Sequence, residues 1–184
     1  MPSGKTHDRI TWAGLVPLML VTYGLTHNDR LTALLALAYL FSALMFGPDL
    51  DIHSVQYKRW GWFRWFWLPY RFCLPHRSIW SHGFLLGTCL RLLYLLVGVT
   101  LLVALMGILL LAWGLLFPPI SLPLAWMSTS VRDWLTQIPQ YRAEIGALLI
   151  GLEAGAMSHT ASDQLASYYK ALKKKRGGRR ASKR

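Results

Sequence analysis

The sequence predicts an all-α membrane protein, a polytopic bundle of about four transmembrane helices with an aromatic and basic segment at the membrane interface. More than half of the 184 residues are apolar. The 39-residue block 79–117 has His82 and Arg91 as its only histidine and charged residue. Nine of the 20 lysines and arginines lie between Lys170 and Arg184. Apolar blocks separated by basic patches are typical of multi-spanning membrane proteins.

The first two apolar blocks, 12–25 and 31–46, predict a helical hairpin closed by the polar turn 26–30. With its ends, each block is about 16 residues long, or about 24 Å at 1.5 Å per residue. This is slightly less than the roughly 30 Å of a hydrocarbon core, and thinning of the bilayer can cover the difference. Taken alone, this part also fits a soluble helical hairpin.

Block 79–117 predicts one long crossing, because no soluble domain of this size could bury such a helix on all sides. After Pro118 and Pro119 we expect a loop with a short amphipathic helix, which reaches Arg142. A last helix over 143–169 then makes the return crossing. The alternative for this last helix is a soluble amphipathic helix lying on the others.

A stripe of small residues along the last helix predicts close packing of its backbone against another helix. The residues that recur every four positions are Ala147, Gly151, Gly155 and His159. Beyond this helix the chain becomes strongly basic and too polar to pack. We therefore divide the chain into a membrane-embedded metal-binding helical domain, residues 1–172, and a disordered basic tail, residues 173–184.

Segment 57–71 interleaves four tryptophans with Lys58, Arg59, Arg64 and Arg71. Tryptophan prefers the headgroup level of a bilayer and cations are drawn to anionic lipids, so this segment is expected to lie in the interface, with membrane lipids as its partners. Aromatic residues between cations can also bind single-stranded nucleic acid. In a chain already inserted in a membrane we expect no nucleic-acid partner.

Histidines and aspartates gather at the ends of the expected helices. The candidate metal ligands are His7, Asp49, Asp51, His53, His76, His82, His159 and Asp163. Alone, each has a plain interpretation, such as an interfacial anchor or a capped turn, but one topology can place all of them on the same side of the membrane. Imidazole and carboxylate without thiolate suit zinc, manganese or iron. Eight ligands exceed the four of one zinc site, so we expect two divalent ions.

These ligands can meet only if the chain crosses the membrane an even number of times between His82 and His159, which gives four spans. The ligand side then carries 16 lysines and arginines and the far side three, with Arg91 inside the membrane. The positive-inside rule makes the ligand side, with both termini, cytoplasmic. His27 falls on the far side and is excluded. Arg91 needs an intramembrane partner, and Glu153 is the expected one.

The motifs GPDLDIH, HRSIWSH and SHTASD, together with His7, resemble the YdjM-like family of inner-membrane metal-dependent hydrolases. They resemble still more closely a related bacterial family of metal-binding proteins that is common in cyanobacteria. The resemblance spans about residues 4 to 163. Two features depart from the YdjM-like pattern: the spacing D-x-D-x-H, and Ser78 and Ile79 where a glycine-containing stretch commonly follows. The resemblance implies a bacterial inner (plasma) membrane or thylakoid location.

Two functions follow from these features. The first is a dinuclear metal-dependent hydrolase of lipid phosphoesters, in which the candidate ligands divide between ligation and acid–base work. Arg77 would then contact the phosphate, although it can equally be a positive-inside charge. The second is a non-catalytic, metal-stabilised small subunit or assembly factor of a larger membrane complex. Metal transport is disfavoured, because only Arg91 and Glu153 are charged within the membrane interior.

Overall fold

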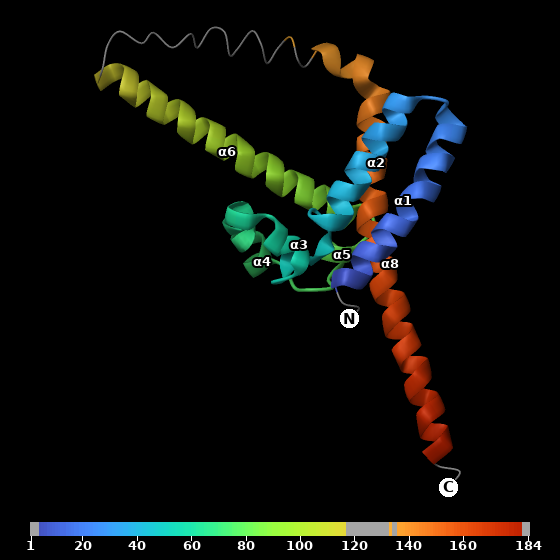
Figure 1. Ribbon diagram of the computed structural model, residues 1–184. Helices are drawn as coiled ribbons and strands as arrows, with labels where there is room; N and C mark the ends of the chain where they lie inside the picture. The colour runs from blue at the N-terminus through green and yellow to red at the C-terminus, as the bar shows by residue number, and fades with distance from the viewer. Residues whose placement is uncertain (1–3, 117–132, 134–135, 182–184) are drawn as a thin grey trace.

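In the computed structural model, residues 4–116, 133 and 136–181 are described, and all the secondary structure within them is helical. The expected hairpin is present as α1 (Gly4–Thr26) and α2 (Asp29–Leu44), which lie side by side (Figure 1). Asn28 caps α2, since its side-chain oxygen accepts a hydrogen bond from the backbone N–H of Leu31 at 3.0 Å. This cap starts α2 at Asp29, within the expected polar turn 26–30.

Helix α8 (Arg142–Ala181) packs along α2, after the short helix η3 (Ile138–Tyr141) (Figure 1). The small-residue stripe forms the contact: a Cβ atom on Gly151 would overlap the carbonyl oxygen of Leu35, and one on Gly155 would lie 2.8 Å from the Cβ of Ser42. The predicted close approach of the two backbones is confirmed. The hydroxyl of Tyr39 also donates to the Thr11 carbonyl at 3.1 Å, which ties α2 to α1.

The basic segment differs from the expectation of disorder, because α8 continues as a helix through Ala181, far beyond the other helices (Figure 1). Lysine, arginine and alanine are good helix formers, and here they extend a helix that is already nucleated by packing. The loop expected after Pro118 lies mostly outside the described residues.

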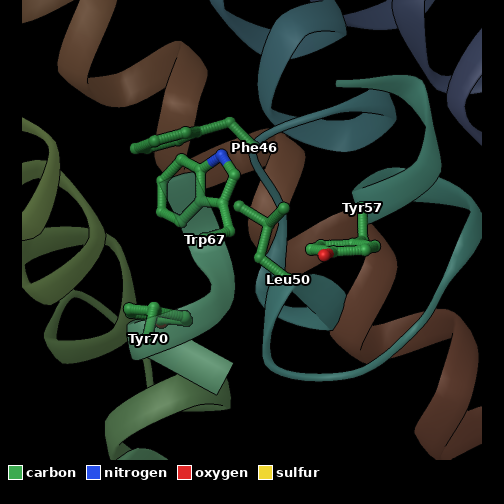
Figure 2. Packing of buried hydrophobic residues seen from close by; sticks show 5 residues of the cluster. All are labelled: Phe46, Leu50, Tyr57, Trp67 and Tyr70. Atoms are coloured by element: carbon green, nitrogen blue, oxygen red, sulfur yellow. The ribbon is translucent and has the colours of Figure 1, made fainter. Parts of the chain in front are cut away.

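Between α2 and the next long helix, the chain folds into five short helices. They are η1 (Pro48–Asp51), α3 (Val55–Arg59), η2 (Gly61–Trp67), α4 (Leu68–Cys73) and α5 (Ile79–His82). An aromatic core holds them together, and its buried members are Phe46, Leu50, Tyr57, Trp67 and Tyr70 (Figure 2). The aromatic segment therefore has two sides: Trp67 is fully buried, whereas Trp62 is 87% exposed.

Helix α6 (Leu86–Leu116) is a single helix of 31 residues, as the sequence predicts for block 79–117. It begins at Leu86 rather than Ile79, because α5 ends at His82 and Leu85 has a left-handed backbone with φ of 58°. Only its first turns are buried, at Gly87, Thr88 and Arg91. Its remaining length diverges from α8 and leaves its apolar side chains exposed (Figure 1).

By length and apolarity, two stretches among the described residues could cross a membrane, Asp29–Asp51 and Leu86–Leu116. Helices α1 and α8 do not meet the same criterion; α8 carries Glu144, Glu153 and Asp163. The structure thus gives an all-helical chain with two candidate spans, and the four-span bundle stays a prediction.

Candidate metal centre

The ends of α1, α2 and α5 and the middle of α8 meet at one place (Figure 1). His7 lies in the second turn of α1, the two aspartates on η1, and His82 at the end of α5. The structure brings together seven of the eight predicted ligands: His7, Asp49, Asp51, His76, His82, His159 and Asp163. They come from segments far apart in sequence, so only the tertiary fold assembles them.

The first ligand group consists of His7, His159 and Asp163, whose ligand atoms all lie within 4.8 Å of one another. The Nε2 atom of His7 is 3.3 Å from Oδ1 of Asp163. The rings of His7 and His159 stack with their centroids 4.1 Å apart. Because His159 and Asp163 are four residues apart, they share a face of α8, as the sequence predicts.

The second ligand group consists of Asp49, His76 and His82, again with ligand atoms within 4.8 Å. Nε2 of His82 lies 3.6 Å from Oδ1 of Asp49. Asp51 stands behind this group, with its fully buried carboxylate 2.9 Å from Nδ1 of His76. A carboxylate on the remote nitrogen of a histidine is the usual way of orienting a metal ligand.

Asp49 connects the two groups. Its Oδ1 faces His82 in the second group, and its Oδ2 lies 3.2 Å from Nε2 of His159 in the first. The backbone around Asp49 is held by Gln56, whose Oε1 accepts from the Asp49 N–H at 3.2 Å and whose amide donates to the Ala43 carbonyl at 2.7 Å. The shared carboxylate is thus placed by the fold rather than by a flexible loop.

Three supporting residues escaped the sequence analysis. The hydroxyl of Ser162 is 2.7 Å from Nδ1 of His7, and that of Ser81 is 2.9 Å from Nδ1 of His82. Ser162 thus contacts the ring nitrogen of His7 that faces away from Asp163, whereas the Nδ1 atom that Ser81 contacts on His82 also lies 3.7 Å from the Asp51 carboxylate. Gln56 is the third supporting residue. Each serine directly precedes a predicted ligand in the sequence, which was the available signal.

The centre fits a bound cation. Many of its polar atoms are buried without a hydrogen-bond partner among the described residues: Oδ1 of Asp49, Oδ2 of Asp51, Nε2 of His76, His82 and His159, and both carboxylate oxygens of Asp163. Buried polar atoms without partners are costly. A divalent ion in each group would satisfy them, and the imidazole and carboxylate donors suit zinc, manganese or iron.

The electrostatics of His7 agree with this fit. Burial and the neighbouring imidazole of His159 lower the pKa of His7, and they outweigh the opposite effect of Asp163 and Asp49. His7 is therefore neutral near pH 7, which is the form of imidazole that binds metal.

Two other predicted residues lie at the edge of this centre or outside it. His53 is exposed, with its ring 5.5 Å from that of Tyr57, and slight desolvation and the positive charge of Lys58 lower its pKa. Among the described contacts, none joins His53 to the other ligands. Arg77 is exposed, with a left-handed backbone at φ of 62°. The excluded His27 lies at the α1–α2 turn, at the opposite end of the hairpin (Figure 1).

Two clefts reach the centre. The larger, about 530 Å³, is lined by Arg77, His82, Thr160, Asp163 and Gln164 among others. The smaller, about 190 Å³, borders His7, Asp49 and His159 from the other side. The non-glycine left-handed conformation at Arg77 is a feature often found at functional sites, and it places this arginine on the wall of the larger cleft.

The expected Arg91–Glu153 ion pair is not formed among the described residues. Arg91 is buried and donates instead to the Ser81 carbonyl at 2.9 Å and to the Thr88 hydroxyl at 2.9 Å. Glu153 accepts from the backbone N–H of Leu85 at 3.0 Å. Both charges hold the turn that carries His82 to the start of α6. Cys73 and Cys89 are free and exposed.

An all-helical fold that gathers histidine and aspartate donors at the helix ends defines a candidate metal-binding protein. Residues 2–173 match the family described as "Uncharacterized metal-binding protein (DUF2227)", and the chain belongs to this family. This match confirms the predicted family of metal-binding proteins. It does not support membership of the YdjM-like hydrolase family. A search of curated proteins gave no match to the chain, and a search of solved structures also gave none.

Proposed function

We propose that the protein is embedded in a bacterial inner (plasma) or thylakoid membrane, binds two divalent ions at this centre, and hydrolyses phosphoester bonds in lipids. The observation that carries the proposal is the pair of ligand groups joined by Asp49 beside a cleft that Arg77 lines. The resemblance of the motifs to the YdjM-like hydrolases supports the reaction class.

The donors divide naturally between two ions. His7, His159 and Asp163 would hold one and His76 and His82 the other, with Asp49 available to both. Bound divalent ions supply Lewis acidity toward a phosphoryl oxygen and toward a water molecule. In the hydrolysis, the water oxygen bonds to phosphorus, the bond from phosphorus to the ester oxygen breaks, and the alcohol leaves with a proton. Arg77 would orient the phosphate through paired N–H groups.

The exposed surfaces support a membrane location. Most of α6 beyond its first turns is apolar and uncovered, which suits contact with lipid tails. Trp62, Phe63 and Trp65 are exposed beside Arg64, as expected for a segment at the headgroup level. We propose that α1 and α8 cross the membrane beside α2 and α6, with both termini and the metal centre on the cytoplasmic side. This is the four-span topology that the charge asymmetry favours.

The test is metal analysis of detergent-purified full-length protein, followed by phosphate release from lipid phosphates and soluble phosphomonoesters. His82→Ala and Asp163→Ala should each lower bound metal and phosphate release, because a lost ligand costs more than the roughly 10- to 100-fold of a lost supporting contact. His27→Ala, at the opposite end of the hairpin, should change neither. Equal metal in all three variants at matched monodispersity would rule out the shared centre.

A specific observation favours the second function, a metal-stabilised subunit of a larger complex: α6 makes few contacts and offers a long apolar surface that a partner helix could cover. In that case the metal-loaded protein would release no phosphate from any substrate. Removing the metal would unfold it, and mild detergent would extract it only within a larger assembly.

A further inference from the structure

An apolar pocket lies next to the polar cleft of the metal centre. Its volume is about 450 Å³, and its apolar walls are Phe84, Leu85, Leu149, Ile150, Ala154 and Met157. Its walls come from the two residues before α6 and from α8. The two helices diverge from this junction (Figure 1). Glu153 also borders it, but one of its carboxylate oxygens is engaged by the Leu85 N–H and holds that wall in place.

The pocket and the larger cleft are lined by neighbouring residues of two segments. Gly83 lines the cleft and Phe84, the next residue, lines the pocket. On α8 a single face serves both, with residues every three or four positions: Ile150, Glu153 and Met157 in the pocket, then Thr160, Gln164 and Ser167 in the cleft. Met157 and Thr160 are about 4.5 Å apart along the helix axis. The two spaces therefore lie one after the other along one face of α8, and together they are called the track.

We propose that this track binds one membrane lipid, with its phosphate-bearing head group in the cleft and one acyl chain in the pocket. The proposal rests on the proposed function and names its substrate class more closely. The two ends of the track differ as the two ends of such a lipid do: Arg77 and the metal ligands at one end, apolar side chains at the other. Each part falls in the range of about 300–1,000 Å³ that holds small ligands.

The direction of the track also suits a lipid. The pocket lies on the side of the centre nearer the start of α8, and the cleft on the side nearer its end. In the proposed topology, the start of α8 is on the far side of the membrane. The pocket thus falls at the depth of lipid tails and the cleft at the depth of head groups. An acyl chain could enter sideways from the same leaflet.

Ala154 offers the sharpest test, because it is the smallest side chain on the pocket wall. Ala154→Trp would fill the pocket without touching the metal ligands. Leu148→Trp is the matched control: it adds the same indole to the same helix, at an exposed position that does not line the pocket. Bound metal and monodispersity must match the unchanged protein, and Ala154→Leu replaces Ala154→Trp where they do not.

The experiment reconstitutes each full-length variant in nanodiscs with phosphatidic acid that carries a photoreactive group in one acyl chain. We expect cross-links concentrated on pocket residues, about ten-fold fewer in Ala154→Trp, and unchanged in Leu148→Trp. In parallel, phosphate release from the long-chain lipid should fall about ten-fold in Ala154→Trp, while release from a soluble phosphomonoester stays within about two-fold.

The outcomes separate the two proposals. Cross-links equal in both variants, or spread evenly along the exposed face of α6, would overturn the acyl pocket and leave hydrolysis standing wherever phosphate is released. Specific cross-links without phosphate release from any substrate would support the pocket and overturn the hydrolase. Cross-linking of the pocket to a co-purified protein instead of lipid would overturn the pocket in favour of a partner helix.

Discussion

The two long helices α6 and α8 pack against the rest of the molecule in opposite ways. Helix α8 carries acids, histidine and glycines, yet it packs along the whole of α2 through Ala147, Gly151 and Gly155. Helix α6 is far more apolar, yet beyond its first three turns, where Tyr94 and Leu95 pack against the aromatic core, it touches little apart from Phe66 at Gly98. Close packing in this molecule therefore comes from small residues that let backbones approach, and not from apolar area.

The same contrast explains where the chemistry lies. Because α8 lies so close to α2, His159 and Asp163 can reach the aspartate that follows α2 and the histidine at the start of α1. Helix α6 contributes no ligand to the centre among its described residues, but its Arg91 holds the carbonyl of Ser81 next to His82. Helix α8 therefore supplies two donors, and α6 holds the turn that carries His82.

The largest effect should come from the residue that joins both ligand groups. Asp49→Ala removes a carboxylate that faces His82 and His159, so binding of both proposed ions should weaken by more than about 100-fold. Asp163 belongs to the first ligand group only, so Asp163→Ala should leave binding of the second proposed ion unchanged. Metal stoichiometry of the purified variants measures this. Identical stoichiometry in the two variants would mean that Asp49 does not serve two sites.

A smaller effect tests the packing contrast directly. Gly155→Leu should force α8 away from α2, because even a Cβ atom there would lie 2.8 Å from Ser42 and 2.9 Å from the Ala43 nitrogen. Overpacking of this kind costs about 1–3 kcal/mol, and we expect the melting temperature to fall by several degrees.

Gly107→Leu is the matched control on α6, where an added Cβ meets nothing within 4 Å. It should leave the melting temperature unchanged. If Gly107→Leu proved as destabilising as Gly155→Leu, then α6 would be packed against something in the purified protein, and the contrast between the two helices would not hold.

Much of this arrangement was predictable from the sequence. The hairpin followed from two apolar blocks and a polar turn, and a close backbone approach of the last helix followed from glycines and alanine at a spacing of four, although its partner α2 did not. The candidate ligands followed from histidines and aspartates that gather near the ends of the expected helices. These signals are local or periodic patterns in the sequence, which can be recognised without knowledge of the tertiary structure.

Other features depend on tertiary contacts that no local pattern encodes. Arg91 finds a backbone carbonyl and Thr88 rather than Glu153, because the turn before α6 folds back over it. That turn also delays the start of α6 to Leu86, through the left-handed Leu85. The two serines that hold His7 and His82 could not be told from ordinary serines without the rings beside them.

The smallest expected effect concerns His53, which the motif GPDLDIH groups with Asp49 and Asp51. The 3₁₀ helix η1 ends at Asp51, and Ile52 continues in an extended conformation. His53 is thereby carried past the centre to an exposed position against Tyr57. We expect His53→Ala to leave metal content within about two-fold of the unchanged protein, because it removes neither a ligand nor a contact of a ligand.

His76→Ala is the matched comparison, since His76 lies 2.9 Å from Asp51 and belongs to the second ligand group. It should lower bound metal by more than about ten-fold. Both variants remove one imidazole from the same stretch between α2 and α6, so general loss of histidine cannot explain a difference between them. If His53→Ala lost metal as His76→Ala does, the loop after η1 would have to fold inward when metal binds, and all eight predicted ligands would then form the centre.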